Sequence, residues 1–284
     1  WSGVEINHLI LMMKVFLTVL LFIFSATSFG QRSHILKPDA QGYLIINSTT
    51  LYKPGDTIML RGYFKAVAIS NLSGASGLPI HITNYPGETL IIGDSLWPGG
   101  SWGHGLALRN TRHARIYGST KHNFKITGSN STKLDANGYP VKTAYFDLMI
   151  TEMSENIVVH DISIRHGGVG LLCKTDVLAC NSKTWYPNTW LENFEFYNLD
   201  IYNTYNEAMY IGHTATYWNI KTNQPYYGAT TDFATYKQPI KLRNVKVHHN
   251  YLHDIWNDAI QIAAAENVEV HDNEVYNWAM KKDY

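Results

Sequence analysis

Two acidic residues, Glu207 and Asp258, occupy the same place in two copies of a repeated segment. The segment NFEFYNLDIYNTYNEAMYI (Asn193 to Ile211) aligns without gaps with NVKVHHNYLHDIWNDAIQI (Asn244 to Ile262). Two carboxylates on neighbouring repeats could serve as an acid and base pair, or they could bind Ca²⁺, which takes several oxygen ligands. The structural alternative is that acidic side chains at turns accept hydrogen bonds from backbone N–H groups.

A second group of polar residues, Lys174, Asp176 and His213, follows the apolar part of two repeats. A Lys or His side chain in such a place can take a proton from a substrate as a general base. The alternative is that these residues are simply solvated. The candidate catalytic residues are therefore Glu207, Asp258, Lys174, His213 and Asp176, with Glu207 and Asp258 also the candidate Ca²⁺ ligands.

The repeats predict the elements that position these residues. Copies of the pattern Asn-apolar-x-apolar begin at residues 156, 193, 244 and 267, and the last two begin 23 residues apart. That period suits a solenoid with one strand-rich coil per repeat and is too short for pairs of helices. Apolar residues alternate with polar ones inside each copy, which predicts strands with one buried face. The sequence therefore predicts an all-β protein of stacked coils.

The alignment also predicts which side chains share a row. One inward row contains Leu171, Met209 and Ile260, and a second contains Cys173, Ile211 and Ile262. An outward row between them contains Leu172, Tyr210 and Gln261. Residues in a row should be neighbours, because adjacent strands lie about 4.8 Å apart.

Two insertions leave the coils just after the inward pair. The steps from Leu171 to Met209 and from Met209 to Ile260 are 38 and 51 residues, so about 15 and 28 residues exceed the period of 23. Aromatic rings stack on the apolar faces of sugars, and long loops on a rigid scaffold often carry binding sites. The candidate substrate-binding residues are Tyr210, Gln261, Trp185, Trp190, Trp218 and Tyr226. Alternatively, these aromatic rings pack on one another to keep the loops folded.

Asn, His and Cys residues in the repeats have structural explanations as well as chemical ones. The recurring Asn156, Asn193, Asn244 and Asn267 suit a left-handed turn position and could form a ladder. His160, His248 and His271 share a row with Tyr197, and a metal-binding histidine row is the chemical alternative. Cys173 and Cys180 could form a disulfide, as in many exported proteins, or Cys173 could be a buried thiol.

The N-terminal region predicts export. Lys14 precedes the apolar run VFLTVLLFIF, and small residues follow it, as in a secretory signal peptide. The run is too short for a membrane-spanning helix, which needs about 20 residues. We expect residues 1–11 to be translated upstream sequence, 12–30 a signal peptide, and 31–284 a β-helix domain that is truncated at its C-terminal end. The protein should therefore be secreted.

Composition agrees with a folded domain and limits its partners. The chain has 284 residues, of which 45% are hydrophobic and 16% charged, and its formal net charge is zero. A neutral chain of this kind does not predict a nucleic-acid-binding surface. We expect a monomer with no nucleic-acid partner and no transmembrane segment.

A family resemblance is carried by KPGDTIMLRGYFKAVAISNLSGASGLPIHITNYPGE (Lys53 to Glu88), NEAMYIGHT and NDAIQIAAA. These segments resemble the secreted right-handed parallel β-helix proteins of the pectate-lyase-like superfamily, especially members from Bacteroidetes-type bacteria. The resemblance implies a right-handed parallel β-helix, to which the repeat spacing adds coils of about 23 residues and two long loop insertions. It also implies a polysaccharide partner.

The reaction is not specified by the resemblance, because this scaffold supports several activities. In lyases with this fold, a Lys or Arg takes a proton beside a uronate carboxylate that a cation has neutralised. The signatures of polygalacturonase-like hydrolases and mannuronan epimerases do not occur in this chain. Two hypotheses follow. The chain is either a polysaccharide lyase or glycoside hydrolase, with Ca²⁺ as its candidate cofactor, or a non-catalytic cell-surface module that binds glycan or protein.

Overall fold

The computed structural model describes residues 31–48, 50–93, 103–128 and 144–280. The expected upstream segment (1–11) and signal peptide (12–30) lie outside the described residues. The chain divides into a unit that ends at Arg32 and a unit that begins at Ser33, and the strands below belong to the second. Among the residues described, no helix has the length and apolar character needed to cross a membrane.

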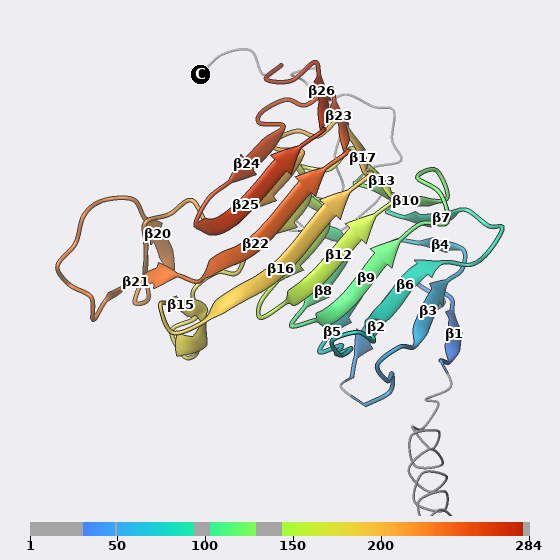
Figure 1. Ribbon diagram of the computed structural model, residues 1–284, viewed down its shortest axis with the longest axis horizontal. Coiled ribbons are helices and arrows are strands. Elements are labelled where there is room, and N and C mark those ends of the chain that lie inside the picture. Colours follow the sequence, from blue (N-terminus) through green and yellow to red (C-terminus); the bar gives the residue numbers. More distant parts are fainter. Residues whose placement is uncertain (1–30, 49, 94–102, 129–143, 281–284) are drawn as a thin grey trace, which may run out of the picture. The chain divides into compact units, whose positions relative to one another are not determined.

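The described chain forms three parallel sheets, of which the largest is shown in Figure 1 as a row of strands coloured from blue to red. Sheet 1 contains, in spatial order, β1 (Ser33–Leu36), β3 (Thr57–Leu60), β6 (Ile80–Asn84), β9 (Arg112–Tyr117), β12 (Glu155–His160), β16 (Trp190–Tyr197), β22 (Lys241–His248) and β25 (Ala265–His271). Sheet 2 contains β4 (Tyr63–Phe64), β7 (Leu90–Ile92), β10 (Phe124–Thr127), β13 (Ser163–Arg165), β17 (Asp200–Tyr202), β23 (Tyr251–His253) and β26 (Glu274–Tyr276). Sheet 3 contains β2 (Tyr43–Asn47), β5 (Ala66–Ser70), β8 (His104–Arg109), β11 (Phe146–Thr151), β14 (Val169–Cys173), β18 (Met209–Ile211) and β24 (Ile260–Ile262).

From β3 onward the chain visits these sheets in a fixed order, sheet 1, then sheet 2, then sheet 3. This order is consistent with a parallel β-helix, in which each strand pairs with the strand one coil later. Val245 pairs with Val268, 23 positions later, whereas Phe194 pairs with Val245, 51 positions later. The coils therefore keep one strand register while their connecting segments differ in length.

The core lies between the sheets and follows the predicted rows. Leu171 pairs with Met209 and Met209 with Ile260, and Cys173, Ile211 and Ile262 pair in the same way. Leu171, Cys173, Met209 and Ile211 are buried, while Tyr210 between the last two is only half-buried. The predicted inward and outward rows are confirmed. Cys173 and Cys180 are both free thiols, so the disulfide alternative is wrong and the buried thiol is correct for Cys173.

The recurring asparagines form the expected ladder, but they lie within sheet 1 strands rather than in turns before them. Asn156, Asn193, Asn244 and Asn267 all have left-handed backbone, with φ of 57°, 62°, 57° and 53°. Nδ2 of Asn193, Asn244 and Asn267 each donates to Oδ1 of the asparagine one coil earlier, at 2.8, 2.9 and 2.6 Å. Asparagine suits this position because its short polar side chain tolerates left-handed backbone.

Aromatic rings stack on the outer face of sheet 1. The centroids of successive rings are 4.6 to 5.1 Å apart and the rings are within 7° of parallel, in the order Tyr117, His160, Tyr197, His248 and His271. The spacing follows that of adjacent strands. The predicted row of His160, Tyr197, His248 and His271 is confirmed, and Tyr117 extends it by one coil.

The two insertions fold against each other. They contain a short 3-10 helix η1 (Ser182–Thr184) and the strands β15 (Trp185–Tyr186), β19 (Tyr217–Asn219), β20 (Gln224–Tyr226) and β21 (Tyr236–Pro239). These strands form an antiparallel sheet in the order β15, β21, β19, β20. The pairing of β15 with β21 joins the first insertion to the second, so the two loops form one small folded unit beside sheet 3.

Candidate functional site

A cavity of about 610 Å³ lies where the second insertion meets the outer face of sheet 3. Its floor comes from sheet 3 through Phe146, Met149, Leu172 and Tyr210, and its wall comes from the insertion through His213, Thr214, Trp218, Asn223, Gln224, Pro225 and Tyr227. Polar residues of earlier coils and of the first insertion complete it, namely Arg109, Thr151, Lys174 and Asp176. A concave site of this size with an apolar floor and a few polar groups is typical of ligand-binding sites.

Strand register places the two cationic side chains along one edge of this cavity. Arg109, at the end of β8, pairs with Thr151, at the end of β11. Ile150 pairs with Cys173 on the next coil, and Lys174 N donates to Ile150 O at 3.1 Å. Arg109, Thr151 and Lys174 therefore come from three consecutive coils at the same end of sheet 3.

His213, Asp176 and Lys174 form a charged group beside the floor. Asp176 Oδ1 lies 3.2 Å from His213 Nε2 and 3.5 Å from Lys174 Nζ. His213 Nε2 and Asp176 Oδ1 are close enough for an ion pair, but their contact lacks hydrogen-bond geometry. Nε2 therefore has no hydrogen-bond partner among the described residues. The three candidates that the sequence placed at the base of the loops are thus brought together.

The backbone fixes the tautomer of neutral His213. Its Nδ1 accepts a hydrogen bond from the N–H of Ala215 at 3.1 Å, and its side chain is buried against the edge of Trp218, with centroids 5.3 Å apart. Because Nδ1 provides its lone pair to Ala215, a neutral ring carries its proton on Nε2. His213 therefore presents an N–H donor toward Asp176 and the cavity.

Tyr210 projects its hydroxyl group into the same cavity. Its Oη lies 2.6 Å from Thr214 Oγ1, and Lys174 Nζ lies 5.0 Å from the centre of its ring. Trp218 is held in the wall by a hydrogen bond from Nε1 to Asn223 Oδ1 at 3.1 Å. A phenol, an ammonium group and an indole ring therefore face one space.

The cavity is electropositive. Arg109 and Lys174 contribute two cations, and Asp176 contributes the single carboxylate among the described lining residues. Partial burial would raise the pKa of Asp176, but its contacts with His213 and Lys174 outweigh burial and hold that pKa below its usual range. Asp176 therefore stays ionised at neutral pH, and the excess positive charge is available to an anionic ligand.

The two paired carboxylates lie outside the cavity lining. Glu207 Oε1 accepts a hydrogen bond from Asn257 Nδ2 at 2.9 Å, and Asp258 Oδ2 lies 3.5 Å from Gln261 Nε2. Backbone bonds from Gly170 N to Glu207 O and from Ala208 N to Asp258 O confirm that the two residues hold equivalent places. Both carboxylates thus have side-chain amide partners rather than the backbone N–H partners that the structural alternative expected.

The remaining aromatic candidates also lie outside the described lining. Trp190 is the first residue of β16 and carries the guanidinium of Arg243 over its ring at 4.2 Å. Trp185 donates from Nε1 to Leu178 O, and Tyr226 donates to Ala229 O. Of the six candidate substrate-binding residues, Tyr210 and Trp218 line the cavity, while Gln261, Trp185, Trp190 and Tyr226 do not.

Several lining residues were not predicted. Arg109, Phe146 and Met149 come from earlier coils, where the repeat pattern is weak and the spacing between paired residues is long: Leu106 pairs with Leu148, 42 positions later. A stricter alignment of these coils would have placed Met149 in the row of Leu172 and Tyr210. Tyr227 had no such signal, because it lies in a loop without a repeat.

Comparison with known proteins gives a weak structural likeness. No family model and no curated protein sequence matches the chain. A solved structure of an alginate lyase from Paenibacillus sp. str. FPU-7 is similar, with a TM-score of 0.47 and 14% sequence identity, over 86% of this chain and 76% of that one. This likeness is too low to support an argument about function.

Proposed function

We propose that the chain is a secreted, right-handed parallel β-helix protein that binds an acidic polysaccharide in the sheet 3 cavity and cleaves it by β-elimination. One observation carries the proposal: Arg109, Lys174, Tyr210 and His213 line one cavity in which cations outnumber carboxylates. A uronate-containing chain supplies both the negative charge that suits the cations and the apolar ring faces that suit Tyr210 and Trp218.

Lyase chemistry fits this site better than hydrolysis does. A glycoside hydrolase of the usual type needs two carboxyl groups on either side of the scissile bond, about 5 to 9.5 Å apart. Asp176 is the single carboxylate among the described lining residues, and Lys174 and His213 both lie at ion-pair distance from it. Glu207 and Asp258, which were candidates for the pair, belong to turns outside the lining.

The reaction divides among the lining residues as follows. Arg109 and Lys174 neutralise the uronate carboxylate, which makes the C5 proton more acidic. The Tyr210 hydroxyl gives its proton to the departing C4 oxygen and takes the C5 proton in its place, while the C5–H electron pair forms the C4–C5 double bond and the C4–O bond breaks. His213 supplies an Nε2–H donor, since Nδ1 is already bonded to Ala215.

These roles change three expectations from the sequence. His213 is assigned as a hydrogen-bond donor rather than a base, because its Nδ1 lone pair is engaged. Lys174 is assigned as a cation, because its Nζ forms an ion pair with Asp176 Oδ1 at 3.5 Å. Tyr210, expected only as a binding residue, takes the proton-transfer role because its hydroxyl lies in the cavity with Lys174 beside its ring.

The test is a screen of the purified protein against alginate, pectate, other uronate polysaccharides and neutral glucans. Ultraviolet absorbance of the unsaturated sugar end and the number of reducing ends are followed together. We expect both signals to rise with an acidic polysaccharide. Reducing ends without absorbance would mean hydrolysis, and binding without either signal would mean a non-catalytic module; either result would refute the lyase proposal.

Matched variants test the role of Tyr210. Tyr210→Phe removes the hydroxyl and should lower kcat by about 10²- to 10⁴-fold, the usual contribution of a proton-transfer group, with substrate binding retained. Tyr226→Phe removes a tyrosine hydroxyl from the second insertion, outside the described cavity lining, and should leave kcat unchanged. Equal effects of the two substitutions would show that Tyr210 has no special role.

A further inference from the structure

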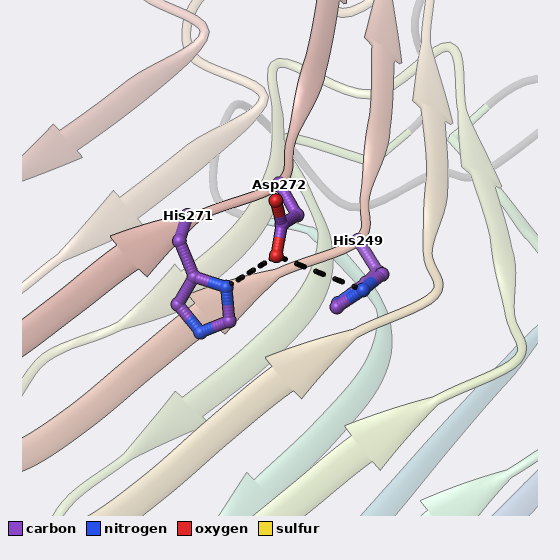
Figure 2. Close-up of side chains that lie close together, drawn as sticks. All are labelled: His249, His271 and Asp272. Carbon is purple, nitrogen blue, oxygen red and sulfur yellow. Dashed lines mark hydrogen bonds and ion pairs between the residues drawn. The ribbon is translucent and has the colours of Figure 1, made fainter.

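A cluster of His249, His271 and Asp272 lies where the sheet 1 strands β22 and β25 turn toward sheet 2. Figure 2 shows the three side chains converging, with the Asp272 carboxylate between the two imidazole rings. Their ligand atoms all lie within 4.8 Å of one another. Asp272 Oδ2 is 2.8 Å from His271 Nδ1 and 3.8 Å from His249 Nε2.

Stacking of two coils creates this cluster. His248 pairs with His271 in sheet 1, so the residues that follow them, His249 and Asp272, lie in equivalent turn positions. Both have left-handed backbone, with φ of 55° and 53°. The repeat therefore fixes the backbone of the two residues side by side, and the ligand atoms come from neighbouring coils of one rigid stack.

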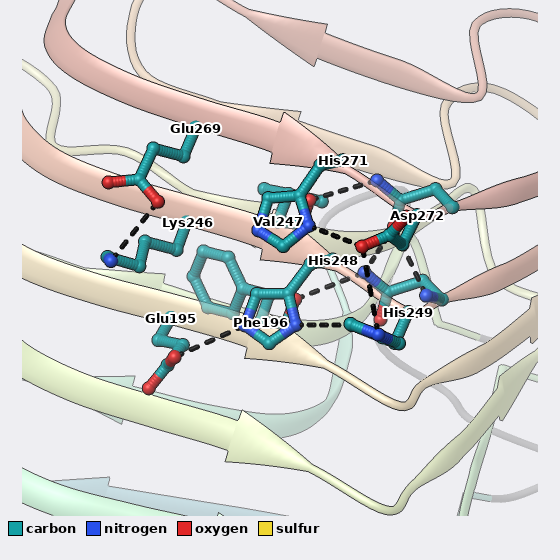
Figure 3. Close-up of polar contacts among 11 residues, drawn as sticks. Glu195, Phe196, Lys246, Val247, His248, His249, Glu269, His271 and Asp272 are labelled. Carbon is teal, nitrogen blue, oxygen red and sulfur yellow. Dashed lines mark hydrogen bonds and ion pairs between the residues drawn. The ribbon is translucent and has the colours of Figure 1, made fainter.

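A chain of hydrogen bonds sets the proton positions, as Figure 3 shows. Glu195 Oε1 lies 3.2 Å from His248 Nε2, and His248 Nδ1 lies 2.9 Å from His249 Nδ1. With Glu195 ionised, His248 donates from Nε2 and accepts at Nδ1 from the Nδ1–H of His249. His249 Nε2 is then left with a bare lone pair facing the Asp272 carboxylate.

The same His–Asp pair elsewhere in the stack is completed differently. His253 Nδ1 lies 2.8 Å from Asp254 Oδ2, and Asn277 Nδ2 donates to Asp254 Oδ1 at 2.6 Å. An amide thus satisfies that carboxylate. At Asp272 the neighbouring coil supplies His249 instead of an amide, so two lone-pair acceptors face each other across 3.8 Å. Such an arrangement is stabilised by a cation or a proton between them.

We propose that His249 Nε2, His271 Nδ1 and Asp272 Oδ2 bind one divalent transition-metal ion such as Zn²⁺, with water completing the coordination. Imidazole and carboxylate are ordinary ligands of Zn²⁺, at about 2.0 to 2.2 Å. The exposed side chains can close the remaining distance by small rotations. When the ion binds, the proton of His271 moves through solvent from Nδ1 to Nε2. Glu195 and His248 act as positioning residues that hold His249 in the tautomer the ion requires.

The experiment is titration of the purified protein, without a polyhistidine tag, with ZnCl₂ in a calorimeter. His249→Asn and Asp272→Asn each remove one ligand while keeping a residue type that tolerates left-handed backbone. Glu195→Gln tests the positioning chain. His253→Gln is the matched control, because it removes a histidine from the His–Asp pair that has an amide partner. Circular dichroism of each variant checks that the fold is retained.

We expect one Zn²⁺ per chain, affinity reduced at least tenfold by each ligand substitution, and affinity reduced about 10- to 100-fold by Glu195→Gln. His253→Gln and Tyr210→Phe should bind Zn²⁺ like the unsubstituted protein, which separates this site from the proposed cleavage site. Absence of Zn²⁺ binding would overturn the proposal. So would His249→Asn and Asp272→Asn variants that bind Zn²⁺ as tightly as the unsubstituted protein. An equal loss in His253→Gln would do so as well, because it would mean that any surface histidine suffices.

Discussion

The asparagine ladder gives a prediction whose size can be worked out from the structure. Asn193 donates to Asn156 at 2.8 Å, accepts from Asn244 at 2.9 Å, and has φ of 62°. Replacement by glycine removes both hydrogen bonds but suits the backbone, whereas alanine removes both bonds and strains the backbone. Comparison of the two variants therefore separates the contribution of the ladder to stability from that of the left-handed backbone.

The expected losses follow from two contributions. Each exposed side-chain hydrogen bond contributes about 0.5 kcal/mol, the lower end of the usual range, so loss of the ladder costs about 1 kcal/mol. Alanine, which lacks the short polar side chain that lets asparagine adopt left-handed backbone, costs about 1 kcal/mol more there than glycine or asparagine. Asn193→Gly should therefore lower the free energy of unfolding by about 1 kcal/mol, and Asn193→Ala by about 2 kcal/mol.

A position without a ladder provides the control. Ala264 has left-handed backbone, with φ of 46°, and no side-chain hydrogen bond. Ala264→Gly should raise the free energy of unfolding by about 1 kcal/mol, the same backbone contribution that separates the two Asn193 variants. Urea unfolding followed by circular dichroism and tryptophan fluorescence measures all three.

Two outcomes would refute this reasoning. If Asn193→Gly were as stable as the unsubstituted protein, the ladder would contribute nothing to stability. If Asn193→Ala were as stable as Asn193→Gly, the left-handed backbone would not be the reason for asparagine at this position.

Other predictions concern the core, a buried acid and the two sites. Phe196 is fully buried, so Phe196→Ala should cost about 3 to 5 kcal/mol in urea unfolding, and a loss below about 1 kcal/mol would contradict the core assignment. Asp147 is fully buried with Oδ1 unbonded, and burial raises its pKa well above the usual range, against the smaller effects of the Gly167 N–H and the Arg165 charge. The folded state therefore binds the Asp147 proton more tightly than the unfolded chain, so its contribution to stability is greatest below the unfolded pKa of about 3.9 and is lost as pH rises toward the folded pKa. Asp147→Asn should accordingly raise the free energy of unfolding at neutral pH by about 1 to 3 kcal/mol, and the gain should shrink toward pH 4. An equal change at neutral pH and at pH 4 would argue against a raised pKa for Asp147. The activity of Tyr210→Phe and the Zn²⁺ affinity of His249→Asn test the two sites.

The strand register could be predicted because the later coils repeat a pattern with a mechanism. Asparagine marks the left-handed backbone position, and the apolar residues at alternate positions mark the buried face. The pairs Leu171–Met209 and Tyr210–Gln261 are therefore found where the alignment put them. Lys174, Asp176 and His213 were also expected together, since their distances along the chain follow from the same register.

The cavity itself could be predicted only in part. Trp190 was assigned to a loop, but it begins a strand of sheet 1 and pairs with Lys241, because the insertion ends earlier than the spacing alone indicates. Trp185 and Tyr226 lie in the insertions as expected, in β15 and β20, yet the sequence carries no information on which way their rings turn. Glu207 and Asp258 were expected near the chemistry because of residue type, whereas their amide neighbours Asn257 and Gln261 give them turn partners.

The pairing of β15 with β21 has a consequence for engineering this scaffold. Trp185 pairs with Pro239 and Tyr186 with Gln238, so each insertion completes the other's sheet. A graft that exchanged only the second insertion for one from a related coil protein would leave β15 with an open edge and would reshape the cavity wall unpredictably. The two loops should be transplanted together as one cassette, with the register of β14, β18 and β24 left untouched as the anchoring frame.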